Sequence, residues 1–196
     1  SATGLYSTAV GIGADASNGG TTALGVGAVA NGYIATALGA DAYAAGDHSI
    51  AEGFRSYTST AATQGIALGY FASASNYAAI AIGSNATATG ISSTALGDTS
   101  IAEGDYSLAA GAFAAATGTS STAVGDSAYA AGQQSTAVGS TALAEGDNST
   151  AVGSAAYAAG LQSSAFGNNA NAVGDDSVAV GNGAYAGGYS SSAFGD

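Results

Sequence analysis

Side chains capable of acid–base or nucleophilic chemistry are scarce in this sequence. His48 and Arg55 are its only basic residues, and it contains no Cys and no Lys. A catalytic nucleophile needs a neighbouring base, and those parts are missing. His48 follows Asp47 at a predicted turn, where a solvated role is expected. Gly-x-Gly stretches such as Gly11-Ile12-Gly13 do not complete a dinucleotide fingerprint. The sequence predicts no enzyme, no catalytic residue and no cofactor.

Aspartates that could bind a metal share one position after a glycine of a repeated pattern. They are Asp47, Asp105, Asp147 and Asp175. Calcium-binding β-helices also place Asp at Gly-rich turns, but in Gly-Gly-x-Gly-x-Asp nonapeptides that this chain lacks. We therefore expect a turn and solubility role and no metal site. A calcium-dependent solenoid, the alternative, would melt on chelation.

The charge balance excludes several classes of partner. The formal net charge is −12, with 13 acidic residues against one Arg. Such a chain cannot neutralise phosphates, which excludes nucleic acid and disfavours anionic membrane surfaces. No apolar run approaches the roughly 20 residues that span a bilayer. Because there is no initiator Met or signal peptide, we expect a segment of a larger protein.

A 14-residue repeat dominates the sequence. The tetrad Thr-Ala-Val-Gly at Thr8–Gly11 recurs along the chain with small variations, and we number each repeat from its final glycine as position 0. The spacing between these glycines is constant except between Gly53 and Gly69, where the chain has two extra residues. Positions +3 and +5 are mostly Ala, +7 is Gly or Asn outside the irregular coil, +10 is usually Ser, and +12 is Ala throughout. Because Asn best tolerates positive φ after Gly, we expect +7 to be a left-handed turn position.

The repeat predicts an all-β parallel β-roll. Two short segments of alternating residues, bounded by glycine corners, favour strands over helix. Two strands and two corners make one solenoid coil, and each strand pairs with its equivalent one coil away. We expect a single repeat domain over residues 1–196, fourteen coils long, with an irregular coil at 54–69 that carries the two extra residues.

Alternation divides the side chains between two faces, which points to an oligomer. We expect +3, +5, +11 and +13 to point into the roll and +4 and +12 to point outward. A solvated position would not be Ala in every coil, so we favour packing against another chain; the alternative is that +12 lines the thin interior. The predicted subunit contact comprises Ala95, Ala123, Ala137, Ala151, Ala165 and Ala179.

Exposed aromatic residues are the best candidates for ligand binding. Tyrosine offers contact area and a hydrogen bond with little entropy loss, although such rings could instead cover the strand beneath or touch a neighbouring subunit. The irregular coil adds Phe54 and Arg55, and Glu52 lies in a column expected to be internal, so a Glu52–Arg55 ion pair is a natural hypothesis. The candidate surface comprises Tyr43, Tyr57, Tyr129, Tyr157, Tyr185, Phe54 and Arg55.

The repeat unit, Ser-x-Ala-hydrophobic-Gly followed by Ala-x-Ala-x-Gly, resembles the head repeats of YadA-like trimeric autotransporter adhesins. The pattern covers Ser7 to Gly195. The resemblance implies a left-handed parallel β-roll that trimerises side by side on a stalk at the outer surface of a Gram-negative bacterium. It also implies attachment to host cells or extracellular-matrix proteins. Since the chain ends within the repeat, we expect stalk and membrane anchor beyond Asp196.

An ice-binding or purely structural β-solenoid is the main alternative. A column of threonines at +11 suggests it, but Ile50, Ile66, Ile80, Leu108 and Val178 interrupt that column. Its alternation also places it inside the roll, away from ice. Thermal hysteresis by the purified protein would support this alternative. The threonines are Thr8, Thr22, Thr36, Thr94, Thr122, Thr136 and Thr150.

Overall fold

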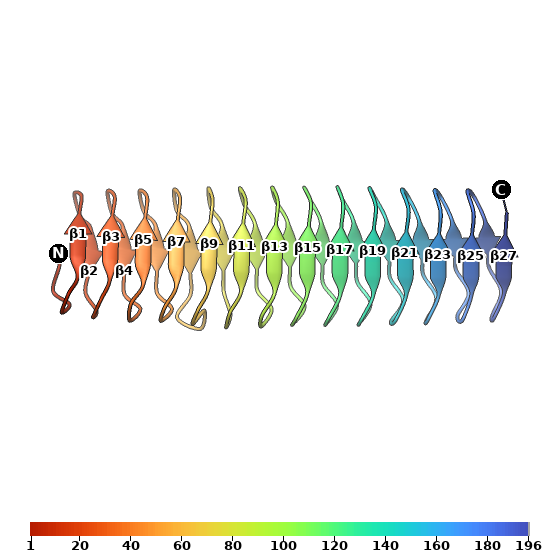
Figure 1. The fold of residues 1–196 in the computed structure, drawn as a ribbon, viewed down its shortest axis with the longest axis horizontal. Coiled ribbons are helices and arrows are strands. Elements are labelled where there is room, and N and C mark those ends of the chain that lie inside the picture. The colour runs from red at the N-terminus through yellow and green to blue at the C-terminus, as the bar shows by residue number, and fades with distance from the viewer. Residues whose placement is uncertain (196) are drawn as a thin grey trace. The chain divides into compact units, whose positions relative to one another are not determined.

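Short parallel strands make up the regular secondary structure of this protein. The computed structural model describes residues 1–195, and every regular element there is a β-strand. The chain divides into two compact units, Ser1–Thr99 and a second that begins at Ser100. In each unit the chain passes alternately through two layers of strands, joined by tight corners (Figure 1). We call them the odd and even layers, after the strand numbers.

The first unit carries three-residue strands in its odd layer and two-residue strands in its even layer. Its odd layer contains β1 (Thr8–Val10), β3 (Thr22–Leu24), β5 (Thr36–Leu38), β7 (Ile50–Glu52), β9 (Ile66–Leu68), β11 (Ile80–Ile82) and β13 (Thr94–Leu96). Its even layer contains β2 (Asp15–Ala16), β4 (Val29–Ala30), β6 (Tyr43–Ala44), β8 (Tyr57–Thr58), β10 (Ser73–Ala74) and β12 (Thr87–Ala88).

The second unit repeats this plan. Its odd layer contains β15 (Leu108–Ala110), β17 (Thr122–Val124), β19 (Thr136–Val138), β21 (Thr150–Val152), β23 (Ser164–Phe166), β25 (Val178–Val180) and β27 (Ser192–Phe194). Its even layer contains β14 (Ile101–Ala102), β16 (Ala115–Ala116), β18 (Tyr129–Ala130), β20 (Leu143–Ala144), β22 (Tyr157–Ala158), β24 (Asn171–Ala172) and β26 (Tyr185–Ala186).

Equivalent residues of successive coils pair in register within each unit. In the second unit Ala123 of β17 lies opposite Ala137 of β19, and all such pairings are parallel. The predicted all-β parallel solenoid of 14-residue coils is therefore confirmed. The division into two units leaves the single fourteen-coil domain a prediction.

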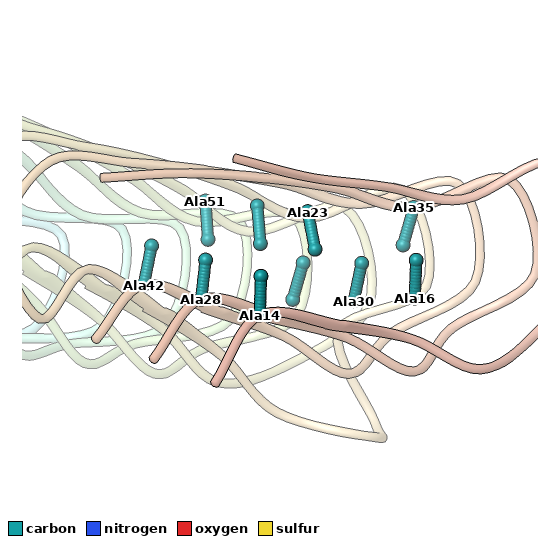
Figure 2. Close-up of a cluster of buried hydrophobic side chains, with 10 residues drawn as sticks. Ala14, Ala16, Ala23, Ala28, Ala30, Ala35, Ala42 and Ala51 are labelled. Atoms are coloured by element: carbon teal, nitrogen blue, oxygen red, sulfur yellow. The ribbon is translucent and has the colours of Figure 1, made fainter. Parts of the chain in front are cut away.

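The interior of the roll holds only small side chains, mainly Ala with Ser or Thr. Positions +3, +5, +10 and +12 point inward, as Ala14, Ala16, Thr21 and Ala23 do, all at most 2% exposed. Figure 2 shows the alanines of the first unit pointing toward one another from the two layers. The largest fully buried side chains in the described residues are Thr and Ser. The two layers therefore lie too close together for Val, Leu or Phe.

This arrangement corrects the predicted facing of the odd layer. The +12 alanines were expected on the outside as a subunit contact, but they are fully buried within their own chain and cannot contact another. The larger +11 and +13 side chains point outward instead. The corrected residues are Ala95, Ala123, Ala137, Ala151, Ala165 and Ala179.

Glycine is required at two corners because backbones of successive coils nearly touch there. At position 0, Gly139 has a φ of +134°, and at position +7 a Cβ on Gly132 would lie 2.0 Å from the carbonyl oxygen of Gly146. The prediction that +7 is left-handed is wrong: Gly132 does not have a positive φ, whereas Thr141 at +2 and Gln134 at +9 do. Glycine at +7 thus serves close approach rather than chain reversal.

The two extra residues enlarge a single corner of the first unit. Strand β8 pairs with β6 at the normal spacing, but Ile50 of β7 pairs with Ile66 of β9. The additional length therefore lies in residues 59–65, between β8 and β9, where a loop extends past the neighbouring corners (Figure 1). Phe54 and Arg55 lie at the opposite, ordinary corner, before β8. The insertion and Arg55 therefore lie on different corners of this coil.

Because the interior is thin, substitutions at neighbouring positions of one strand should affect stability very differently. We expect Ala137→Leu to lower the free energy of unfolding by about 3 kcal/mol, because the added carbons have no space between the layers. Thr136→Leu on the outward face of the same strand should change it by less than about 1 kcal/mol. Urea unfolding followed by circular dichroism measures both. Equal effects would contradict the observed facing.

Two glycines at position +7 allow a second comparison of the effect of a substitution on stability. Gly132→Ala should lower the free energy of unfolding by about 2–3 kcal/mol, because its Cβ would overlap the next coil. Gly188→Ala at the same repeat position should be nearly neutral, since its Cβ approaches only the Ser191 side chain, at 3.6 Å or more. Thermal unfolding of the two variants tests this. A destabilising Gly188→Ala would show that close approach is not the reason.

Candidate functional site

The outer face of the odd layer is an apolar surface in both units. Positions +11 and +13 alternate with the buried alanines; +11 carries mainly Thr, Ile and Val, with Ser in two coils, and +13 carries mainly Val, Leu and Phe. Leu24, Ile82 and Phe166 are 42%, 38% and 41% exposed despite their size. The +13 column comprises Val10, Leu24, Leu38, Glu52, Leu68, Ile82 and Leu96 in the first unit and Ala110, Val124, Val138, Val152, Phe166, Val180 and Phe194 in the second. Exposed and largely apolar columns of this kind are typical of association surfaces.

The threonines of position +11 also face outward, contrary to prediction. Thr122, Thr136 and Thr150 are half-buried and lie in register on successive strands of the odd layer. The prediction that these threonines are buried, which was one argument against an ice-binding surface, is therefore wrong. The second argument against ice binding still applies, because Leu108 and Val178 interrupt the +11 threonine column in the second unit. A regular flat rank of threonines is not formed.

The outer face of the even layer is polar with aromatic patches. Tyr43 and Tyr57 stack with ring centroids 5.7 Å apart and an interplanar angle of 15°. Tyr129 and Tyr185 are exposed, and Tyr157 is half-buried. The predicted +4 column is thus exposed or half-buried throughout, and the structure pairs Tyr43 with Tyr57.

One tyrosine of this face carries a strong hydrogen bond. The Tyr157 hydroxyl donates to Glu145 Oε2 at 2.6 Å. This hydrogen bond raises the pKa of Tyr157 above its ordinary value of 10.0, with smaller contributions from desolvation and from the negative charge of Glu145. The phenol is thereby held protonated and fixed in orientation.

Phe54 and Arg55 belong to an aromatic cluster at the corner between the odd and even layers. The Phe54 ring stacks on Tyr70 at 5.5 Å and meets Phe71 edge-on at 5.7 Å. The Arg55 guanidinium lies 5.2 Å from the centre of the Phe54 ring and 5.7 Å from that of Phe71. We call Phe54, Arg55, Tyr70 and Phe71 the corner cluster. All four are exposed.

Sequence reasoning missed two members of this cluster and misassigned a partner. Tyr70 and Phe71 occupy positions +1 and +2, one coil beyond Phe54 and Arg55, so aligning the coils across the insertion would have revealed the stack. Arg55 Nε lies 3.6 Å from Asp41 Oδ2, not near Glu52. The predicted Glu52–Arg55 pair is wrong, because Glu52 points outward from the odd layer and is exposed.

The aspartates of position +8 stabilise corners. Asp47 Oδ1 accepts a hydrogen bond from the Tyr33 backbone N–H one coil earlier, at 2.8 Å. Asp147 and Asp175 make the same contact with the N–H groups of Gln133 and Leu161. These bonds support the turn role predicted for this column. Among the described residues no three His, Cys, Asp or Glu side chains converge on one point.

The described surface offers no enclosed site for a small ligand. Residues 1–195 form no pocket. In that same range no helix is long and apolar enough to span a membrane. What the surface does present is one apolar face, one face with tyrosines, and corners. Such surfaces suit contact with macromolecules.

Comparison with known families decides the classification. The model of the YadA head domain repeat, which describes two copies, matches residues 2–28, 30–56, 61–86, 88–114, 116–142, 144–170 and 172–196. The chain belongs to the YadA head family. The family resemblance predicted from the 14-residue pattern is thereby confirmed.

A solved structure agrees with this membership. The collagen-binding domain of the Yersinia adhesin YadA is 26% identical, with a TM-score of 0.54, and the match covers 72% of this chain and 70% of that chain. No curated protein matches the chain. The chain is thus an adhesin-type head of parallel β-roll coils, like the YadA head.

The Tyr157–Glu145 bond gives a spectroscopic prediction. Glu145→Ala should lower the pKa of Tyr157 toward 10.0, because the carboxylate that accepts the phenol proton is removed. Ultraviolet difference spectra during alkaline titration measure the change. Glu103→Ala is the control, since the equivalent neighbour in the next coil is Ala115 and the titration of Tyr157 should not move. An unchanged titration in Glu145→Ala would contradict the contact.

Proposed function

We propose that this chain is the head of a bacterial cell-surface adhesin that assembles as a homotrimer and attaches to host extracellular-matrix or cell-surface proteins without chemistry. The proposal rests on one observation: each unit has an apolar outer face on its odd layer and a tyrosine-bearing outer face on its even layer. The first needs a partner of its own kind, and the second is free to meet a ligand.

Self-association through the odd layer follows from the thin interior. Because the roll cannot bury Val, Leu, Ile or Phe internally, these side chains remain exposed in an isolated chain. Their burial is favourable by about 25 cal/mol per Å² of apolar surface. Three odd layers that face a common axis would cover both the +11 and +13 columns. This assignment replaces the +12 alanines as the proposed trimer contact.

The outer face of the even layer is then the proposed ligand surface. It stays exposed when the odd layers are covered, and it carries Tyr43, Tyr57, Tyr129, Tyr157 and Tyr185. The YadA domain that resembles the chain is described as collagen-binding, which supports a matrix protein as the ligand class. Trimerisation would present three copies of the face and raise the apparent affinity. A location on the bacterial surface, with membrane attachment through another segment, follows from the same proposal.

The tyrosine surface can be tested within one unit. The triple variant Tyr129→Ser, Tyr157→Ser, Tyr185→Ser should bind immobilised matrix proteins, collagen included, at least about tenfold more weakly, because aromatic anchors dominate such contacts. Asn171→Ser, at position +4 between Tyr157 and Tyr185, should bind as the unchanged chain does. Light scattering on the same samples should report trimers. Unchanged binding by the triple variant would remove the tyrosine role, and a monomer would contradict the assembly.

A further inference from the structure

Two irregular features of the first unit occur at one level of the roll. The enlarged corner, residues 59–65, connects β8 to β9, and the corner cluster lies on the opposite side at the corners that precede β8 and follow β9. Elsewhere in this unit the spacing of the position 0 glycines is constant. An insertion and an exposed aromatic cluster thus occur at one coil level, on the two edges that flank the odd layer.

The enlarged corner is well defined and points away from its own chain. Gly65 N–H donates to Ala62 O at 2.8 Å, and Gln64 N–H donates to Asp47 O at 2.8 Å. Ser59 Oγ donates to Ser75 O, also at 2.8 Å. Thr60, Ala61 and Gln64 are nevertheless exposed. The loop is therefore an ordered projection with small, uncharged side chains at its tip.

The corner cluster is equally ordered and equally uncovered. Phe54, Tyr70 and Phe71 are 39%, 53% and 37% exposed although they pack on one another. Arg55 has its ion-pair partner, Asp41, within the chain. An occupant of the cluster consequently needs no charge of its own, and covering the rings with small apolar and hydroxyl groups would be favourable.

We infer that residues 59–65 of one copy pack against the corner cluster of the next copy in the assembled head. This inference rests on the proposed homotrimer. Subunits in a cyclic trimer contact each other heterologously, so one edge of each odd layer meets the opposite edge of its neighbour. Copies in register therefore place the loop edge of one chain beside the cluster edge of the next at the same coil level.

This contact would fix the register of the assembly. The +13 column is apolar through nearly all of its length, so a slip of one coil, about 4.8 Å, would exchange one Val or Leu for another at little cost. Of the described residues, only Glu52 is charged in that column. The loop and cluster match only when coils are level. Their occurrence at one coil is then explained, because either feature alone would not define the register.

Cysteine crosslinking tests this register directly, because the chain has no Cys of its own and only introduced cysteines can form disulfides. The pair Ala61→Cys and Tyr70→Cys, introduced together, should form a covalently closed trimer on oxidation, visible on non-reducing gels. A disulfide requires Cα atoms within about 7 Å. Strand β9 and the width of the roll separate the two positions within one chain, so only neighbouring copies can be joined.

The matched control moves one cysteine along the same corner. Ala61→Cys with Ala40→Cys places the second thiol at position +1 two coils away from Tyr70, about 10 Å along the stack. This pair should give less than one tenth of the crosslinked product. Equal or greater crosslinking through Ala40, or a trimer that crosslinks through neither pair, would overturn the inference while leaving the trimer intact. A monomer by light scattering would instead contradict the proposed function.

A second variant keeps the aromatic cluster unchanged. Removal of Thr60 and Ala61 restores the regular spacing of the repeat and should leave each chain folded. It should raise the dissociation constant of the trimer at least about tenfold, because the aromatic contact is lost. Sedimentation over a dilution series measures it. An unaltered dissociation constant would contradict the inference.

Discussion

The distance between the two layers is the constraint on which the rest of the structure depends. Alanine and serine side chains fill the interior, and the largest fully buried side chain in the described residues is threonine. Every larger apolar side chain must therefore lie outside. A chain of 47% apolar composition consequently exposes Val, Leu, Ile and Phe in ordered columns. Within its own chain this apolar surface stays uncovered, and the proposed trimer is the assembly that would bury it.

The same closeness explains where the repeat tolerates variation. Backbones of successive coils approach so tightly at positions 0 and +7 that a Cβ would fall within about 2.5 Å of a carbonyl oxygen in most coils. Positions +4, +6 and +13 project outward and accept Tyr, Asp, Glu or Phe. Extra residues are accommodated at a corner, as in residues 59–65, where the strands on either side keep their pairing. Functional variety is therefore confined to outward positions and corners.

The spacing of the glycines was enough to predict coil length, parallel pairing and the irregular coil, because backbone hydrogen bonding imposes that period directly. The facing of the odd layer could not be predicted in the same way. Alternation separates Ala137 from Thr136 and Val138 but does not say which set points inward, and the usual preference for large apolar residues in a core favoured the wrong answer. Invariant alanine marked the interior. Tyr70 was missed because the stack forms only between coils.

A surface without pockets must obtain specificity from repetition. The described residues present tyrosines singly or in pairs, as at Tyr43 and Tyr57, and each contact alone is weak. The proposed trimer would hold several copies in one register and offer these contacts at fixed intervals, so that an extended partner with its own repeat would engage many at once. Register then determines affinity as much as residue type does. The thin interior thus leaves the larger apolar side chains outside, the proposed trimer covers them, and the proposed loop contact keeps its coils level.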